Sequence, residues 1–188
     1  MVFIDPLAIM LFGVAASTLF IAYYVLATAM NKKNLAAIAA PMMVLGLFDF
    51  VSGFYMSFTW PLPGAYNMLF GDPMLLLGLI MLAGGFGLYK NIDVRSLSLV
   101  GFLLGIYLFT GSYSMVADKL ERGVYLLPAL SFFLVSALSA IVSPVVYLNP
   151  KGAGKIAYYT LAVLLVLVVI LAMMISVTSL LGHLASPP

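Results

Sequence analysis

Hydrophobic residues along this chain occur in six long runs, which short polar or proline- and glycine-containing breaks separate. A helix needs roughly 20 apolar residues to cross the hydrocarbon core of a bilayer, and most of the runs reach that length. Because the runs are continuous and do not alternate with polar residues, they predict membrane-spanning helices and not the strands of a closed barrel. The predicted spans are Leu7–Met30, Leu35–Thr59, Pro73–Tyr89, Leu97–Ala117, Val124–Leu148 and Ile156–Leu181.

The composition agrees with this pattern. Of the 188 residues, 65% are hydrophobic and 7% are charged, and the mean hydropathy is +1.21. Soluble domains carry about 25% charged residues, so this chain has too few charges to cover a water-facing surface. The sequence therefore predicts an all-α, polytopic membrane helix bundle that forms one transmembrane domain over residues 1–188, with the lipid bilayer as its surroundings.

The basic residues predict an orientation for this bundle. Six of the eight lie in the first, third and fifth breaks: Lys32, Lys33, Lys90, Arg95, Lys151 and Lys155. Only Lys119 and Arg122 lie on the other side. Basic residues near span ends favour the cytoplasm, so we expect both termini outside the cell membrane. The opening residues, Met1 to Pro6, contain no Lys or Arg, and the first run is expected to be a retained span and not a secretory signal.

Residues 60–73, between the second and third runs, are expected to form a short re-entrant or interfacial element. The sequence WPLPGAYNMLFGDP is apolar but broken by three prolines and two glycines. Non-helical backbone at membrane depth is tolerated only where protein or a water-filled cavity surrounds it. We therefore expect a short helix that packs against protein on the outer face. A hairpin lying among the lipid headgroups is the alternative.

Asp49 is the strongest single candidate for a functional site, because it lies well inside the second predicted span. A carboxylate at the bilayer centre costs about 3 kcal/mol, so such a residue is expected to face the bundle interior. Gly46, Ser52 and Gly53 lie three to four residues away and form a narrow face on which another helix can approach. Asp49 is then either a proton- or solute-binding group or a structural aspartate that joins two helices.

Asp72, Tyr66 and Asn67 are further candidate binding residues. Asp72 precedes Pro73, and an aspartate before a proline is also a typical helix start, so the alternative role for Asp72 is an N-cap. Tyr66 and Asn67 are the polar residues of the 60–73 stretch. They are suited either to hydrogen bonding a solute or to closing a turn.

Small residues recur along several predicted spans. Gly101 and Gly105 form a GxxxG pair, and Ser136, Ser139 and Ser143 share one face of the fifth span. Such stripes favour close helix packing. A pore wall of serines is the alternative, with Gly13, Ser17, Tyr24 and Thr28 as a matching polar face on the first span.

Several kinds of chemistry are excluded by residues that the sequence lacks. Without cysteine there is no disulfide, iron–sulfur cluster or thiolate metal site. The single histidine, His183, lies beyond the last apolar run and excludes bis-histidine haem ligation within one chain. No catalytic set, metal site, cofactor motif or nucleic-acid patch is recognisable, so we expect no catalytic residue, metal, cofactor or nucleic-acid partner.

Three strings in the sequence are distinctive: FIDPL near the start, GLFDF at Gly46–Phe50 and PLPGAYNMLFGDP at Pro61–Pro73. On these strings the whole chain resembles a family of small archaeal membrane proteins classified as a domain of unknown function. The resemblance implies a multi-span archaeal protein and no particular reaction. In length and span number the chain also looks like the small acetate channels. Their N-terminal Asn-Pro-Ala-Pro motif is absent here and the predicted orientation is reversed, so no acetate-site residue is carried over.

Two functions follow from these patterns. The first is a small-solute channel or transporter that uses Asp49 as a buried titratable or coordinating group. The second is a structural or accessory subunit that associates with itself or with other membrane subunits. A membrane enzyme acting on lipid or quinone is less favoured, because a catalytic set is missing. A cavity that reaches Asp49 would favour transport, whereas a dry aspartate bonded to a neighbouring helix would favour a structural role.

Overall fold

The computed structural model describes residues 6–32, 34–148 and 155–185, and these residues form helices joined by short connections. Six helical segments are long and apolar enough to cross a membrane, which confirms the predicted six-span bundle. The long helices are α1 (Leu7–Ala29), α2 (Ala39–Thr59), α3 (Tyr66–Tyr89), α4 (Leu97–Ala117), α5 (Leu126–Val142) and α7 (Lys155–Ala185). The short ones are η1 (Ala36–Ile38) before α2, η2 (Gly123–Tyr125) before α5 and α6 (Val145–Leu148) after it.

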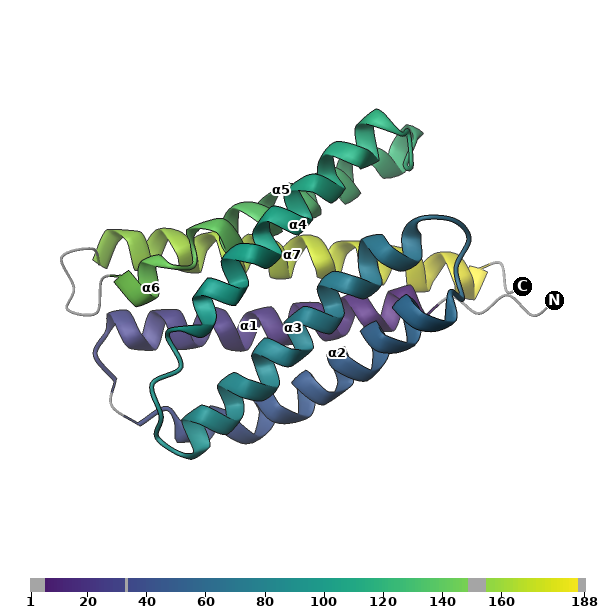
Figure 1. Ribbon diagram of the computed structural model, residues 1–188. Helices are drawn as coiled ribbons and strands as arrows, with labels where there is room; N and C mark the ends of the chain where they lie inside the picture. The colour runs from purple at the N-terminus through teal and green to yellow at the C-terminus, as the bar shows by residue number, and fades with distance from the viewer. Residues whose placement is uncertain (1–5, 33, 149–154, 186–188) are drawn as a thin grey trace.

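Successive long helices run in opposite directions, so α1 begins and α7 ends at the same end of the bundle (Figure 1). We call this the terminal end and the other the opposite end. The connections after α2 and α4 lie at the terminal end, and those after α1 and α3 lie at the opposite end, where α6 ends and α7 begins. With six spans that alternate in direction, the first begins and the last ends at the same end of the bundle.

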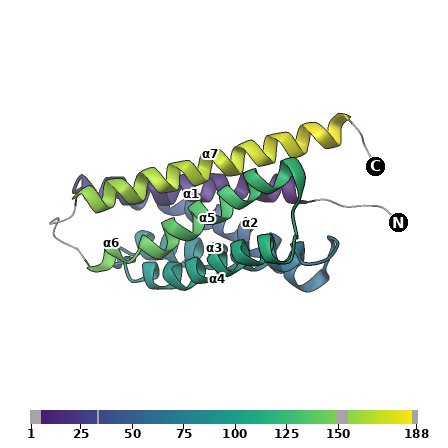
Figure 2. The ribbon, with the colours of Figure 1, turned by 90° about the horizontal axis from the view of Figure 1, so that it is seen from above.

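The helices pack as three pairs, and each pair has more extensive contacts within itself than with its neighbours: α2 with α3, α1 with α7, and α4 with α5. Seen from above, α1 and α7 lie on one side and α3 and α4 on the other, with α5 between them (Figure 2). Contacts of α5 with α7 and of α3 with α4 join the pairs. The three pairs therefore meet around a central region that no single pair fills.

Three helices end in the same hydrogen-bonded turn. After α1, Asn31 takes a left-handed conformation (φ 56°), and the Lys32 amide donates to the Ala27 carbonyl at 2.9 Å. Asn91 after α3 and Lys119 after α4 repeat this left-handed turn. Asparagine adopts this conformation more readily than most residues, which explains why short Asn-containing breaks separate the spans.

The α2–α3 pair is held by direct contact between the two backbones. Glycines recur every seven residues on α3, at Gly71, Gly78 and Gly85, and face Gly46 and Gly53 on α2. A methyl group added to Gly78 would lie 2.3 Å from the Phe50 amide nitrogen, and one at Gly53 would lie 2.3 Å from the Leu75 nitrogen. Only residues without a Cβ allow this approach, which confirms the close-packing interpretation of the glycine stripes.

The predicted re-entrant or interfacial element at 60–73 is wrong as a separate element. Helix α3 begins at Tyr66 and continues through Pro73, so this stretch divides into a connection of residues 60–65 and the first two turns of the third span. Proline can lie inside a membrane helix because neighbouring groups compensate for the missing amide hydrogen bond. The third span is therefore longer than predicted, and Asp72 is not its N-cap.

The backbone contact between α2 and α3 predicts that Gly78→Ala destabilises the protein by about 1–3 kcal/mol, the usual cost of overpacking. Reversible unfolding in mixed micelles, followed by circular dichroism as denaturing detergent is added, measures this change. Gly84→Ala is the matched control on the same helix, because its added methyl group would lie 3.3 Å from the flexible end of Met42. Equal stability of the two variants would contradict the packing assigned to Gly78.

Candidate functional site

Asp49 lies in the middle of α2 and is fully buried, at 0% exposure. Its Oδ2 accepts a hydrogen bond from the Ser17 hydroxyl of α1. Its Oδ1 has no partner among the described residues and lies against Gly13, where an added methyl group would lie 2.9 Å away. Gly13 and Ser17 are one helical turn apart, so a small residue and a hydroxyl together make room for the carboxyl group on α1.

This environment is closely packed. A methyl group at Gly13 would also lie 2.4 Å from Cε1 of Phe48, so the surrounding space is filled. Asp49 is not among the residues that line the internal cavity described below. In this geometry the carboxyl group connects α1 to the α2–α3 pair, whose helices otherwise have limited contact with α1.

Asp72, on α3, forms hydrogen bonds to both α2 and α4. Its Oδ1 accepts a hydrogen bond of 2.6 Å from the Ser57 hydroxyl of α2, and its Oδ2 accepts one of 2.6 Å from the Tyr107 hydroxyl of α4. The side chain is half-buried, in the second turn of α3 and next to Pro73. Asp72 therefore joins three helices near the terminal end, and it lies apart from Asp49.

Tyr66 and Asn67 are both engaged in contacts with the protein backbone. The buried Asn67 side chain accepts from the Leu62 amide at 2.9 Å and donates to the Gly64 carbonyl at 3.1 Å, which closes the α2–α3 connection. The Tyr66 hydroxyl donates to the Leu120 carbonyl at 2.8 Å and so ties α3 to the α4–α5 connection. The turn-closing alternative describes the observed contacts of Asn67.

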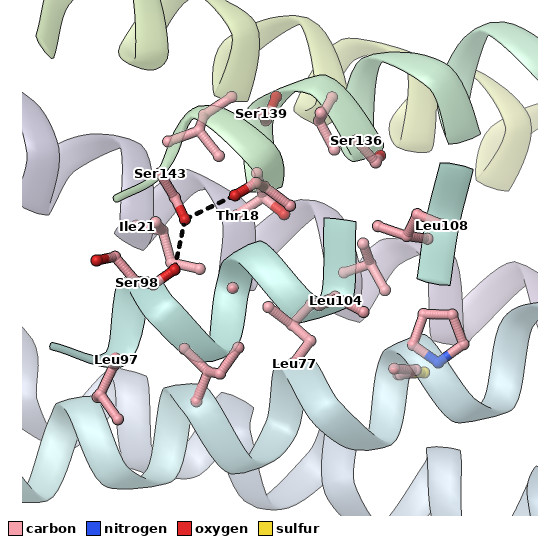
Figure 3. A pocket seen from close by; sticks show the side chains of 18 of the residues that line it. Thr18, Ile21, Leu77, Leu97, Ser98, Leu104, Leu108, Ser136, Ser139 and Ser143 are labelled. Carbon is pink, nitrogen blue, oxygen red and sulfur yellow. Dashed lines mark hydrogen bonds between the residues drawn. The ribbon is translucent and has the colours of Figure 1, made fainter. Parts of the chain in front are cut away.

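A cavity of about 200 Å³ lies where the three helix pairs meet, and we call it the central cavity. Its wall comes mainly from α1, α3, α4, α5 and α7. Figure 3 shows the serines of α5 on one side and Leu104 and Leu108 of α4 on the other, with Thr18 of α1 between them in this view. The lining begins at Leu7 on α1 and continues to Val25, a separation of about 27 Å at the helical rise of about 1.5 Å per residue.

The polar residues of this wall are confined to one half of its length. They are Thr18, Tyr24, Arg95, Ser98, Ser136, Ser139 and Ser143, and they extend from the middle of the bundle to the opposite end. The half nearer the terminal end is lined by leucine, methionine, phenylalanine, valine and proline, including Leu11, Met74 and Phe133. The few polar side chains of a mainly apolar wall are therefore confined to the half nearer the opposite end.

Some hydroxyls of the wall are bonded to the protein and others are not. Ser139 donates to the Val135 carbonyl at 2.7 Å, and Ser143 donates to the Ala140 and Ser98 carbonyls at 2.7 and 2.9 Å. The buried hydroxyl oxygens of Ser98 and Ser136 have no partner within the described ranges. Unpartnered hydroxyls in apolar surroundings are costly and can be satisfied by a bound molecule.

A compensated charge lies at the opposite end of the cavity. The Arg95 guanidinium contacts the Asp93 carboxylate, with an Nη2–Oδ2 distance of 2.5 Å and an Nε–Oδ1 distance of 2.9 Å. These hydrogen bonds lower the pKa of Asp93 to about 2 and raise the pKa of Arg95. Both groups stay ionised at physiological pH, so the arginine presents no unpaired charge to the cavity.

The fold and this site define a polytopic α-helical membrane protein with an internal cavity among its helices. The chain belongs to the family described as "Protein of unknown function (DUF981)", whose model matches residues 1–186. The predicted membership of a multi-span family of unknown function is confirmed. No curated protein and no solved structure matches the chain.

The structure brings together a different set of residues from the predicted site. Asp49 and the group of Tyr66, Asn67 and Asp72 do not meet around a common space. Ser136, Ser139 and Ser143 line the cavity, as the pore-wall alternative required, and so does Tyr24 of the predicted α1 face, but Thr18 takes the place of Ser17. Ser98 and Arg95 also line the cavity, and the sequence analysis did not predict this. Arg95 lies just before α4 and Ser98 lies in its first turn, and no sequence pattern there indicated a cavity.

The Ser17–Asp49 hydrogen bond predicts an energetic coupling between the two side chains of about 1 kcal/mol, the size measured for interhelical hydrogen bonds in membranes. A double-mutant cycle of Ser17→Ala and Asp49→Ala measures it through the unfolding free energy in mixed micelles. A cycle that pairs Asp49→Ala with Ser136→Ala is the control, because Ser136 belongs to the cavity and lies away from Asp49. Equal coupling in the two cycles would contradict the role assigned to Ser17.

Proposed function

We propose that the chain is a channel or transporter for a small uncharged molecule, and that this molecule occupies the central cavity. The observation that carries the proposal is the length of the cavity, whose wall includes α1 residues about 27 Å apart. The hydrocarbon core of a bilayer is about 30 Å thick, so a cavity of this length supports a path that follows the membrane normal.

The lining favours an uncharged molecule. Among the lining residues of the described ranges, Arg95 alone carries a formal charge, and Asp93 neutralises it. An ion inside such a wall would lose its hydration without gaining a partner of opposite charge, which costs several kcal/mol. Hydroxyl groups can instead replace the hydrogen bonds that an uncharged solute makes with water.

In this proposal Asp49 is a structural residue. Its burial, its bond to Ser17 and its absence from the cavity wall support the fastening of α1 to α2 and not the coordination of a solute. In the transport hypothesis, the solute therefore binds in the central cavity and not at Asp49. An accessory subunit has only the exposed apolar helix faces in its favour, and every membrane span presents such faces to lipid.

Stopped-flow light scattering of proteoliposomes tests the proposal with urea, glycerol and 1,2-propanediol as solutes. We expect at least one of them to enter faster than it enters vesicles without protein. Ser136→Phe, which fills the cavity, is expected to lower that entry about tenfold, because passage depends steeply on pore diameter. Asp49→Asn is expected to leave the rate unchanged in protein that is correctly folded.

The matched control for the blocking variant is Leu138→Phe, on the same helix. Leu138 is 49% exposed on the outer face of the bundle, so the added ring would meet lipid and not the cavity. If none of the three solutes enters faster than in protein-free vesicles, the proposed passage is wrong. If Leu138→Phe and Ser136→Phe lower entry equally, the path does not run through the cavity.

We also propose that the terminal end faces outward and that the protein is archaeal, as the basic residues and the family resemblance indicate. Four described basic residues lie in or beside the connections of the opposite end: Lys32, Lys90, Arg95 and Lys155. Lys33 and Lys151, which belong to the same predicted set, lie outside the described residues. Basic residues are retained on the cytoplasmic side, which supports a cytoplasmic opposite end.

Cysteine labelling tests this orientation without background, because the chain contains no cysteine. We expect Val124→Cys, in the connection between α4 and α5, to react with a membrane-impermeant maleimide on intact cells. Ile92→Cys, between α3 and α4, is expected to react only after the membrane is permeabilised. Both positions are well exposed, at 80% and 58%. The reverse pattern would place the terminal end in the cytoplasm.

A further inference from the structure

The polar side chains of the central cavity begin at the middle of the bundle, with Thr18 on α1 and Ser136 on α5. Thr18 is eleven residues from Leu7 on α1, and Ser136 is ten residues from Leu126 on α5, which corresponds to about 15 Å of helix in each case. The next turn of α5 toward the terminal end carries Phe132 and Phe133 instead of a serine. The two hydroxyl residues therefore mark the boundary between the two halves.

The apolar half of the wall favours apolar molecules over water. Cavities lined by leucine, isoleucine and phenylalanine remain dry and bind apolar molecules, and one of about 150 Å³ accepts benzene. The central cavity is about 200 Å³. By proportion it has room for a molecule of about eight heavy atoms. A strongly hydrated solute would leave this half empty, whereas an alkyl chain would fill it.

Two side chains at the boundary have unused hydrogen-bonding capacity. Thr18 is 5% exposed and has no hydrogen bond to another described residue. The Ser136 hydroxyl is buried and also lacks a partner in the described part of the chain. Ser139, one turn further along α5, differs because its hydroxyl donates to the Val135 carbonyl. A bound molecule would therefore find unbonded hydroxyls on two different helices of the cavity wall.

We infer that the central cavity binds a small uncharged amphiphile, with an alkyl body in the apolar half and a hydroxyl-bearing head on Thr18 and Ser136. This inference rests on the proposed function and names the class of molecule that the cavity takes. A vicinal diol suits the two hydroxyls, since each of its oxygens donates and accepts one hydrogen bond. The molecule 1,2-hexanediol has the required size and both parts.

Photolabelling in nanodiscs tests the inference by binding alone. The probe is pentan-1-ol with a photoreactive diazirine on its alkyl chain, which matches the size of the cavity, and mass spectrometry locates its adducts. We expect adducts on lining residues of the apolar half, such as Leu104 and Leu108. Competition by 1,2-hexanediol and by hexane gives an apparent affinity for each, and the diol is expected to protect better than the alkane.

The head group is tested by removing one hydroxyl at a time. Thr18→Val and Ser136→Ala are each expected to lower the diol-to-alkane affinity ratio about fivefold, the factor that corresponds to one hydrogen bond of about 1 kcal/mol. The partition of each competitor into lipid is the same for every variant, so it cancels when the diol-to-alkane ratios of two variants are compared. Ser136→Thr, which retains a hydroxyl, is expected to preserve the ratio, and so is Ser139→Ala, whose hydroxyl is already bonded.

Each outcome decides the inference separately from the proposed function. Adducts in the apolar half together with a ratio that falls in Thr18→Val and Ser136→Ala support it. Adducts with an unchanged ratio overturn the assigned head-group site, and no adducts in the cavity overturn the binding of an amphiphile altogether. Solute entry into proteoliposomes is measured independently, so a failed photolabelling experiment and a failed transport experiment are distinguishable.

Discussion

The contact between the backbones of α2 and α3 is the constraint on which the remaining architecture depends. Lipid offers no hydrophobic driving force between two apolar helices, so their association rests on close packing and on hydrogen bonds. The heptad glycines bring the two helices within direct backbone contact and make this pair the most extensive one in the bundle. The pair then forms a firm wall onto which α1 and α4 are attached by polar side chains.

Two of those attachments use a carboxyl group. Asp49 joins the α2–α3 pair to α1 through Ser17, and Asp72 joins it to α4 through Tyr107. In hydrocarbon such groups have no water with which to bond, so they are retained near their protein partners. Because the joints are local, the space between them is not filled by side chains. The central cavity is the consequence of three compact pairs that are fastened at separate points.

The number of the spans and their order along the chain were predictable from the sequence, because long apolar runs have one stable form in lipid. The start of α3 was not, since Pro73 after Asp72 resembles a helix start and the membrane tolerates proline inside a helix. Asp49 was recognisable as a buried carboxyl group. Its partner was not, because Ser17 and Thr18 are adjacent on a helix that is apolar around much of its circumference. One turns toward Asp49 and the other toward the cavity, and only the packing of α1 decides which.

The pairing of the helices also determines the order in which the molecule can be assembled. The α2–α3 and α4–α5 pairs consist of neighbours in sequence, so each can close as a hairpin soon after its second helix leaves the ribosome. Helix α1 is made before the other described helices, yet its principal partner is α7, which is made after them. Until α7 is made, the inner face of α1 is therefore open to lipid, and the wall of the cavity is completed only when α7 enters the membrane.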